Sequence, residues 1–245
     1  MNTYGKILSI KNLFILSPKI LLFRHCNMSK MAQMDSQGKR LIRLYRDQGW
    51  KSIFALIRLL DAPYQETEQL ITKNGTVLEL GCGEGLFSNY LALTSVKRRV
   101  IGVEIDKRRI KSADRGLVNV HFISGDATQF NIPKADTIVM MHLLHHLNSF
   151  GEQESLVKKC KSCLGNSGKL IIVEIEPRLS FKYFLTWSVD HFLVPWIFEG
   201  RFYSKIYFRK KKEWINLLEK NGFKVKSYCA DRWKPFSHIL FECTN

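Results

Sequence analysis

The pattern that most constrains this chain is the alternation of short apolar runs with helical stretches between residues 76 and 175. Short runs rich in Val, Ile and Leu are typical of buried strands, and the segments between them repeat their apolar residues at helical spacing. Strands that alternate with helices form a parallel sheet covered by helices on both faces. We therefore expect an α/β fold with strands at 76–80, 99–104, 119–123, 135–141 and 169–175, and helices at 86–95, 107–115 and 152–164.

The flanking segments complete this fold. Residues 37–60 repeat apolar residues at helical spacing, which predicts one helix that ends at "APY", and a short acidic helix follows at 65–71. A helix at 210–220 precedes strands at 223–229 and 238–242, which we expect to pair antiparallel at the sheet edge. The predicted organisation is a leader or over-called start (1–36) and one domain (37–245), divided into a helical cap (37–73), a core (74–176), a lid insert (177–209) and a C-terminal helix with strands (210–245).

Charge is unevenly distributed along the 245 residues, whose net charge is +16. Residues 1–60 carry eleven Lys or Arg against two acids, and residues 177–212 carry eight against two. Such surpluses favour an anionic partner, either membrane headgroups, nucleic acid or an acidic substrate, although a solvated basic surface has the same composition. The six cysteines follow no disulfide framework, so we expect a reducing compartment and a cytoplasmic protein, with peripheral membrane contact as a further expectation.

The first 36 residues allow three interpretations. Lys11, Pro18 and Lys19 interrupt the apolar stretch that a signal peptide would need. The segment is a basic amphipathic membrane contact, a targeting leader, or sequence before a true start at Met28, Met31 or Met34, and we favour the last. No apolar run reaches the length of about 18 to 20 residues that a membrane-spanning helix requires.

The stretch "TVLELGCGEGLFSNYL" places a glycine loop after the first predicted strand. A dinucleotide-binding loop has the spacing G-x-G-x-x-G, in which the third glycine lets the helix pack closely. Here the glycines are Gly81, Gly83 and Gly85, position 86 is Leu, and Glu79 precedes the loop. The loop contains no lysine to hold a phosphate. A loop of this kind holds a small polar ligand against bare backbone.

These residues resemble motif I of the class I S-adenosylmethionine-dependent methyltransferases. The following motifs resemble the family in the same order: Glu104 ends the second strand, where a carboxylate can accept hydrogen bonds from ribose hydroxyls, "SGDAT" follows the third, and "GKLIIVEIEP" matches the fifth. The resemblance implies a Rossmann-like, seven-stranded, mostly parallel sheet, with S-adenosyl-L-methionine as cofactor. The residues implied to bind it are Glu79, Gly81, Cys82, Gly83, Gly85, Glu104, Ile105, Asp126, Ala127 and Met141.

The fourth strand leads into "MMHLLHHL", which bears on the methyl acceptor. The segment lacks the Asn/Asp-Pro-Pro-aromatic signature of family members that methylate base or glutamine amines, and resembles the "LHHL" turn of small-molecule methyltransferases. His142, His145 and His146 have the spacing to share one face of a helical turn, where one of them can act as general base. The alternative is that they pack beneath the cofactor or cap the next helix. We expect no metal site.

Residues 181–208 contain eleven of the 29 aromatic residues and are followed by "RKKK" at 209–212. In the resembled family this segment forms a lid over the acceptor pocket, and its composition suits an apolar ligand or a bilayer surface. We expect methyl transfer to a hydrophobic small molecule or lipid, at oxygen. The first alternative is an RNA methyltransferase, because basic and aromatic residues also bind RNA. The second is a membrane-associated protein that binds the cofactor without catalysis.

Overall fold

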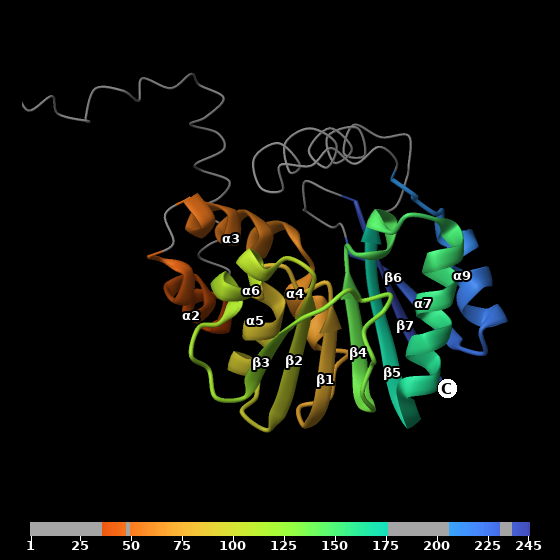
Figure 1. Cartoon of the computed structure of the whole chain (residues 1–245), viewed down its shortest axis with the longest axis horizontal. Coiled ribbons are helices and arrows are strands. Elements are labelled where there is room, and N and C mark those ends of the chain that lie inside the picture. The colour runs from red at the N-terminus through yellow and green to blue at the C-terminus, as the bar shows by residue number, and fades with distance from the viewer. Residues whose placement is uncertain (1–35, 48–49, 176–205, 231–236) are drawn as a thin grey trace, which may run out of the picture. The chain divides into compact units, whose positions relative to one another are not determined.

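The computed structural model of the protein describes residues 36–47, 50–175, 206–230 and 237–245 (Figure 1). Its strands are β1 (Gly75–Leu80), β2 (Arg98–Glu104), β3 (Val120–Ser124), β4 (Ala135–Met141), β5 (Leu164–Ile175), β6 (Lys224–Cys229) and β7 (His238–Thr244). Its helices are α2 (Ser36–Tyr45), α3 (Trp50–Asp61), α4 (Tyr64–Glu68), α5 (Leu86–Thr94), α6 (Lys107–Ala113), α7 (Phe150–Cys163) and α9 (Lys211–Lys220), with a 3-10 turn, η2 (Leu144–His146).

The strands form one seven-stranded sheet in the order β3-β2-β1-β4-β5-β7-β6. Strands β1 to β5 are parallel, and β7 runs antiparallel to both of its neighbours, β5 and β6. The predicted α/β fold with an antiparallel edge is therefore confirmed. The chain leaves β1 toward β2 on one side and returns to β4 on the other, so the strand order reverses between β1 and β4. Ligands of such sheets bind at this point, beyond the carboxyl ends of the strands.

Alternating strand residues divide the core into two layers. On β4, Ile138 and Met140 face one layer, and Val139 and Met141 face the other. The first layer is closed by α7 and α9, and the second by α2, α4 and α5. Because the strands are buried on both faces, they are apolar throughout, which is why the sequence marks them so clearly.

The N-terminal cap differs from the prediction of a single helix over 37–60. The structure has two helices, α2 and α3, with a turn at Arg46–Asp47 between them. Asp is unfavourable inside a helix, which is consistent with the turn at Asp47. The apolar spacing continues across the break, so periodicity alone could not locate it. The short helix predicted at 65–71 is α4, which ends at Glu68.

The other elements lie close to their predicted bounds, except that β5 begins at Leu164, five residues before the predicted position. Its first residue pairs with Ala135, and the register then shifts before Lys169 pairs with Thr137. The leader prediction for 1–36 falls, except for Ser36, outside the described residues. Of the predicted lid at 177–209, the structure describes only residues 206–209.

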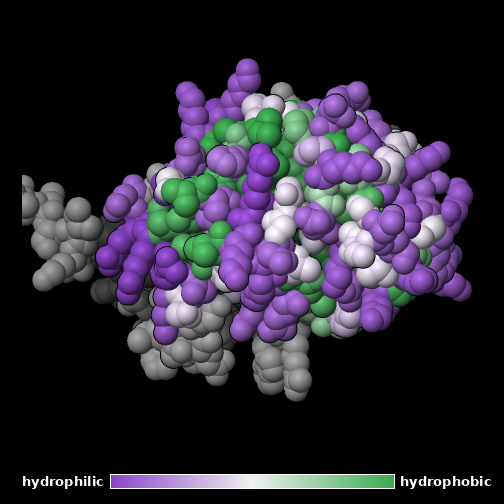
Figure 2. Space-filling view, turned by 90° about the horizontal axis from the view of Figure 1, so that it is seen from below, coloured by the Kyte–Doolittle hydropathy of each residue, from purple (hydrophilic) through white to green (hydrophobic). Residues whose placement is uncertain are grey.

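In Figure 1 the parallel strands run upward, so their carboxyl ends lie at the top and their amino ends at the bottom. Figure 2 looks at the bottom edge, where hydrophilic side chains surround smaller hydrophobic areas. Among the described residues, the two most exposed large apolar side chains are Val96 and Val118, which lie in the loops before β2 and β3. Among the described helices, none has the length and apolarity needed to cross a bilayer.

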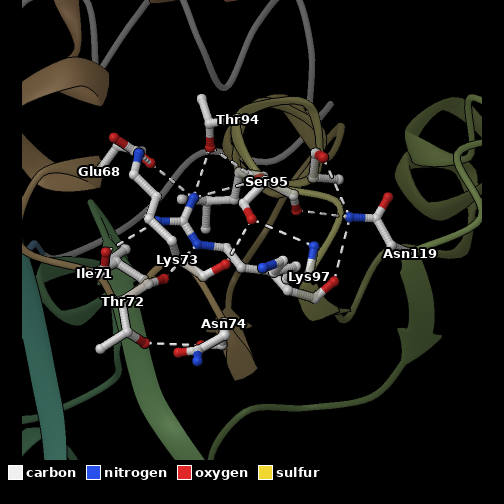
Figure 3. A network of polar contacts seen from close by, with 12 residues as sticks. Glu68, Ile71, Thr72, Lys73, Asn74, Thr94, Ser95, Lys97 and Asn119 are labelled. Carbon is white, nitrogen blue, oxygen red and sulfur yellow. Dashed lines mark hydrogen bonds and ion pairs between the residues drawn. The ribbon is translucent and has the colours of Figure 1, made fainter.

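At this amino edge Arg98, the first residue of β2, contacts α4 and the end of α5. Figure 3 shows the polar network to which its partners Glu68, Ile71, Thr72 and Thr94 belong. Arg98 is 1% exposed, and its guanidinium lies 2.8 Å from a carboxylate oxygen of Glu68. It also donates to the carbonyl oxygens of Ile71 (2.9 Å) and Thr72 (2.6 Å) and to the hydroxyl of Thr94 (2.6 Å). The guanidinium therefore supplies hydrogen-bond donors to the backbone carbonyl groups that follow α4 and to the hydroxyl at the end of α5.

Glu68 is the anionic partner of this arginine and also pairs with Lys73. Burial acts to raise the pKa of its carboxyl group, but the hydrogen bonds from Lys73 and Arg98 outweigh burial, and the pKa is lowered. The pair is therefore charged at neutral pH, and removing one member would leave the other as a buried charge with fewer partners.

We expect Arg98→Met to lower the free energy of unfolding by roughly 3–5 kcal/mol, because it removes one partner of a buried ion pair. Urea denaturation followed by circular dichroism measures this change. Arg99→Met is the matched control, because Arg99 is the next residue and is exposed. Equal stability of the two variants would contradict the structural role given to Arg98.

Candidate functional site

The site begins at the loop that joins β1 to α5. Gly81, Gly83 and Gly85 all have left-handed backbone conformations, with φ of 73°, 54° and 71°. The backbone N–H groups of Gly81 and Cys82 both donate to the carbonyl oxygen of Val103, at 2.8 and 3.0 Å. These two hydrogen bonds hold the loop against the end of β2.

The three glycines meet different surroundings. A Cβ atom at Gly81 would lie 2.7 Å from the side chain of Leu143, and one at Gly85 would lie 2.7 Å from Ala113 and Phe122. At Gly83 the nearest atom to such a Cβ is the end of the Arg109 side chain, 3.8 Å away. Gly81 and Gly85 therefore allow close packing of the protein, whereas Gly83 faces space that can admit a ligand.

Glu79 lies just before this loop, on the α5 side of the sheet. It is 3% exposed and accepts a hydrogen bond of 2.5 Å from the hydroxyl of Ser88, in α5. Burial raises the pKa of Glu79 to about 7, although the hydrogen bonds from Ser88 and the positive charge of Arg58 act in the opposite direction. A carboxyl group that is half ionised near neutral pH will gain its full charge when a cation binds beside it.

Glu104 ends β2, and backbone N–H groups hold its carboxylate. Its Oε2 accepts from Gly83 (2.9 Å) and its Oε1 accepts from Asp106 (3.0 Å). Each carboxylate oxygen can accept a second hydrogen bond, so this arrangement leaves acceptor capacity for a pair of hydroxyls. Ile105 follows with 65% of its surface exposed.

Asp126 and Ala127 lie in the turn after β3. The Oδ1 of Asp126 accepts from the backbone and hydroxyl of Thr128, at 2.9 and 2.8 Å, which shapes the turn. Gly125 donates to the carbonyl of Glu104 at 3.0 Å, so the turn lies beside the end of β2. Asp126 is exposed and Ala127 is buried.

Two further residues predicted to bind the cofactor are buried at the same edge. Met141 is 6% exposed at the end of β4, on the α5 side. Cys82 is 6% exposed, and burial raises the pKa of its thiol well above the usual range. The ten residues predicted to bind the cofactor thus come from the carboxyl ends of the neighbouring strands β1 to β4, at the point where the strand order reverses.

The three histidines do not form the shared helical face that their spacing predicted. His142 precedes the turn η2 with a left-handed φ of 55°, which is unusual for a residue other than glycine. His145 instead pairs its Nδ1 with Glu174 at 2.5 Å, and its ring lies 4.1 Å from that of His146. His142 therefore bonds to Arg58 and His238, whereas His145 bonds to Glu174.

Four residues that sequence reasoning did not select also belong to this edge. Three of them form a hydrogen-bonded chain with His142. Nη1 of Arg58 in α3 lies 3.1 Å from Nδ1 of His142, and Nε2 of His142 lies 3.1 Å from Nδ1 of His238 in β7. Nε2 of His238 lies 3.1 Å from Oδ2 of Asp61 in α3. Tyr45 of α2 donates to the carbonyl of Glu84 at 2.6 Å, within the glycine loop. No local pattern could identify them, because each makes its contact with a distant part of the chain.

A family model for methyltransferase domains matches residues 50–228. The chain belongs to this methyltransferase family. A relative, (S)-coclaurine N-methyltransferase of Thalictrum flavum subsp. glaucum, is 27% identical over 198 residues, which cover 66% of this chain and 52% of the relative. Demethylmenaquinone methyltransferase of Thermotoga maritima is 23% identical over 163 residues, which cover 61% of this chain and 70% of the relative. The chain thus spans about half the length of the first relative.

Solved structures show the same fold. DhpI in complex with SAH aligns with a TM-score of 0.61 and 20% identity, over 85% of this chain and 94% of DhpI. A SAM-dependent methyltransferase from Aquifex aeolicus aligns with a TM-score of 0.56 and 18% identity, over 76% of this chain and 91% of its own. These likenesses confirm the Rossmann-like methyltransferase fold.

The cofactor of this methyltransferase is S-adenosylmethionine, as its family membership shows. The described residues fit this group, because the space at Gly83 admits a ligand beside Glu104. Glu104 offers oxygen acceptors for ribose hydroxyls, and Glu79 offers a carboxylate for the ammonium group of the methionine end. The roles of the individual residues stay predictions.

Gly83→Arg should abolish cofactor binding, because the new side chain would fill the space that admits it. The wild-type protein should melt roughly 5–10 °C higher when S-adenosylhomocysteine (SAH) is present at 100 times its Kd. Gly116→Arg is the control, since Gly116 has a similar φ of 72° and open surroundings in the loop before β3. If SAH raises the melting temperature of Gly83→Arg as much as that of the wild type, the assignment of the cofactor site is wrong.

The affinity for SAH should rise with pH through the pKa of Glu79. Below about pH 7 the carboxyl group must lose a proton before it can pair with the ammonium group, so Kd should be about tenfold larger at pH 6 than at pH 8. The ligand-free protein has the opposite dependence: a raised pKa means that the contribution of Glu79 to stability is complete below about pH 4.5 and is lost as pH rises through 7.

Isothermal titration calorimetry between pH 6 and 8 measures this dependence, and Glu79→Gln is the variant to compare. It should bind more weakly at pH 8 and show a nearly flat profile. If the affinity of Glu79→Gln for SAH depends on pH as steeply as that of the wild type, the titrating group is not Glu79.

Proposed function

We propose that this methyltransferase transfers a methyl group to an oxygen atom of a hydrophobic small molecule or lipid. The observation that carries the proposal is an aromatic segment against the histidine turn. The Phe208 ring lies 5.0 Å from the ring of His145, and the backbone N–H of Tyr207 donates to the carbonyl of His145 at 3.0 Å. Both residues belong to the aromatic-rich stretch 181–208, whose remaining aromatic residues lie outside the described residues.

The histidine turn can supply a base for a hydroxyl acceptor. Glu174 accepts the Nδ1–H of His145, which leaves the lone pair of that imidazole on Nε2. The other oxygen of Glu174 accepts the backbone N–H of Leu144 at 2.8 Å, so the carboxylate is fixed in place. On proton transfer the acceptor O–H bond breaks, the proton binds Nε2 of His145, and the charge of Glu174 stabilises the imidazolium.

S-adenosylmethionine supplies a methyl group on a sulfonium, already activated for transfer. The chain therefore has to position the two reactants and exclude water more than it has to activate the donor. Among the relatives, the names of an N-methyltransferase of (S)-coclaurine and an O-methyltransferase of eugenol leave both nitrogen and oxygen open as acceptor atoms. The pair His145–Glu174 supports oxygen, because a hydroxyl must lose its proton in the reaction.

The proposal places the enzyme in the cytoplasm, at the surface of a membrane from which it takes its acceptor. The exposed basic side chains of α2, which has no acidic residue, support an anionic surface as partner: Lys39, Arg40 and Arg43. Phosphates of RNA would suit the same cations. Apolar residues mixed among the aromatic residues of 181–208 favour the lipid.

Incubating the enzyme with methyl-labelled S-adenosylmethionine and a cell lysate, followed by separation into organic and aqueous phases, tests this function. We expect label in the organic phase, none with Gly83→Arg, and a rate lowered about 10²- to 10⁴-fold by His145→Gln with unchanged SAH affinity. Label confined to nucleic acid would establish the RNA alternative instead. With no label in any fraction, a cofactor-binding protein without catalysis would replace the proposal.

A further inference from the structure

A buried glutamine of α7 connects the histidine turn to the end of the aromatic-rich stretch. Gln153 is 0% exposed, although it carries a polar amide group. Its Nε2 donates to the carbonyl oxygens of Leu144 (3.0 Å) and Tyr207 (2.8 Å), and its Oε1 accepts from Nε of Arg209 at 2.7 Å. Leu144 begins η2, whereas Tyr207 and Arg209 follow Gln153 by 54 and 56 residues. One amide group therefore joins α7, the histidine turn and residues 206–209.

The orientation of this amide group follows from its partners. A guanidinium only donates, so the atom that faces Arg209 must be Oε1, and the NH2 group of Gln153 must face the two carbonyl oxygens. These hydrogen bonds offset the free-energy cost of burying a polar group. An apolar side chain of the same size could pack at this position, but it could not join the three segments.

His145 lies within a closed loop of hydrogen bonds that includes Gln153. The carbonyl of Leu144, which precedes His145, accepts from Gln153, and the carbonyl of His145 itself accepts from the backbone N–H of Tyr207 at 3.0 Å. Gln153 also binds the carbonyl of Tyr207, so it fixes one peptide group of His145 directly and the other through Tyr207. Glu174 of β5 holds the imidazole at Nδ1. The backbone and the side chain of His145 are therefore held by two different elements, α7 and β5.

Arg209 holds the amide group of Gln153 in this orientation. Its Nη2 donates to the carbonyl oxygen of Phe150, at the start of α7, at 3.1 Å. The guanidinium carbon lies 4.6 Å from the centroid of the Phe150 ring and 5.6 Å from that of Trp214, in α9. A planar guanidinium can donate hydrogen bonds and stack on rings at the same time, which an ammonium group cannot do. Contacts with two helices therefore fix the guanidinium that binds Gln153.

We propose that Gln153 and Arg209 are positioning residues for methyl transfer, which fix the position of His145, the proposed base. The inference rests on the part of the proposed function that assigns the base to His145. A displacement of about 1 Å between reacting groups can lower a rate by about 10²-fold, so the loss of these hydrogen bonds should slow methyl transfer. The residues predicted to bind the cofactor lie at the ends of β1 to β4 and not in α7, so the affinity for SAH should not change.

Rates of methyl transfer to a lipid extract of the lysate, at saturating labelled S-adenosylmethionine, test this role. Gln153→Met keeps the length of the side chain and removes its hydrogen bonds, and it should lower the rate about 10- to 100-fold. Arg209→Met should lower the rate less, because it leaves both hydrogen bonds from Nε2 of Gln153. The Kd for SAH, measured by calorimetry, should stay within about twofold of the wild-type value in both variants.

A double-mutant cycle with His145 separates positioning from a general loss of structure. If Gln153 acts through His145, adding Gln153→Met to His145→Gln should lower the remaining rate by less than about twofold. A merely structural role of Gln153 would lower the rate by the same factor whether or not His145 is present.

Two variants serve as controls, each assayed below its melting temperature. Gln69→Met changes an exposed glutamine that follows α4, and Arg98→Met weakens the fold at the opposite edge of the sheet. Both should keep the wild-type rate. An unchanged rate in Gln153→Met, an equal loss of rate with and without His145, or a weakened affinity for SAH would each overturn the inference. If Gln153→Met does not fold, the same cycle with Arg209→Met decides the matter.

Failure of the proposed function would give a different result. A wild-type rate in His145→Gln would overturn the assignment of the base and, with it, this inference. Label confined to nucleic acid would overturn the proposed class of acceptor. A loss of rate in Gln153→Met that is independent of His145 would overturn only the roles of Gln153 and Arg209.

Discussion

The five residues between β1 and α5 must reverse the direction of the chain, and this requirement shapes the whole site. The reversal uses left-handed backbone at Gly81, Gly83 and Gly85, and two hydrogen bonds to Val103 tie the loop to β2. In this position the N–H of Gly83 meets the carboxylate of Glu104, and Gly81 can pack against the turn after β4. The loop thus brings the ends of β1, β2 and β4 into one arrangement.

Two glutamates of this arrangement lie in opposite environments. Glu79 is buried under α5, with Ser88 as hydrogen-bond donor, and its pKa is raised to about 7. Glu104 is held by two backbone N–H groups at the end of β2. The first is suited to respond to a cation, and the second to accept hydrogen bonds from neutral hydroxyls. Identical side chains are therefore suited to different ligand groups because the fold gives them different surroundings.

The sequence predicted those features that depend on neighbouring residues. Strands β1 to β4 were predicted to within one residue at each end, because buried parallel strands are apolar throughout. The glycine loop and its acids were predicted because a motif records them in order. The break between α2 and α3 was missed, since the apolar spacing of Leu41, Leu44 and Leu56 continues across it. The spacing of apolar residues indicates which face of a helix is buried, but it does not indicate whether the helix is continuous.

The hydrogen-bonded chain at the carboxyl edge could not be predicted in the same way. Its members contact one another across 84, 96 and 177 positions of sequence. His142 was selected for its spacing to His145, yet its partners are Arg58 and His238. Nothing in the segment around His238 distinguishes it from an ordinary strand residue. Only the sheet order, which places β7 beside β5, brings it to the site.

Arg58 and Asp61 lie three residues apart on α3, so the path from one through both histidines to the other closes into a ring. Loss of Asp61 would remove the acceptor at Nε2 of His238, and loss of His142 would remove a contact between the guanidinium and the end of β4. Replacing any one of the four residues alone would therefore remove a hydrogen bond from its neighbour in the network. The four positions therefore form one structural unit, although two lie in the cap and His238 lies at the start of the last strand.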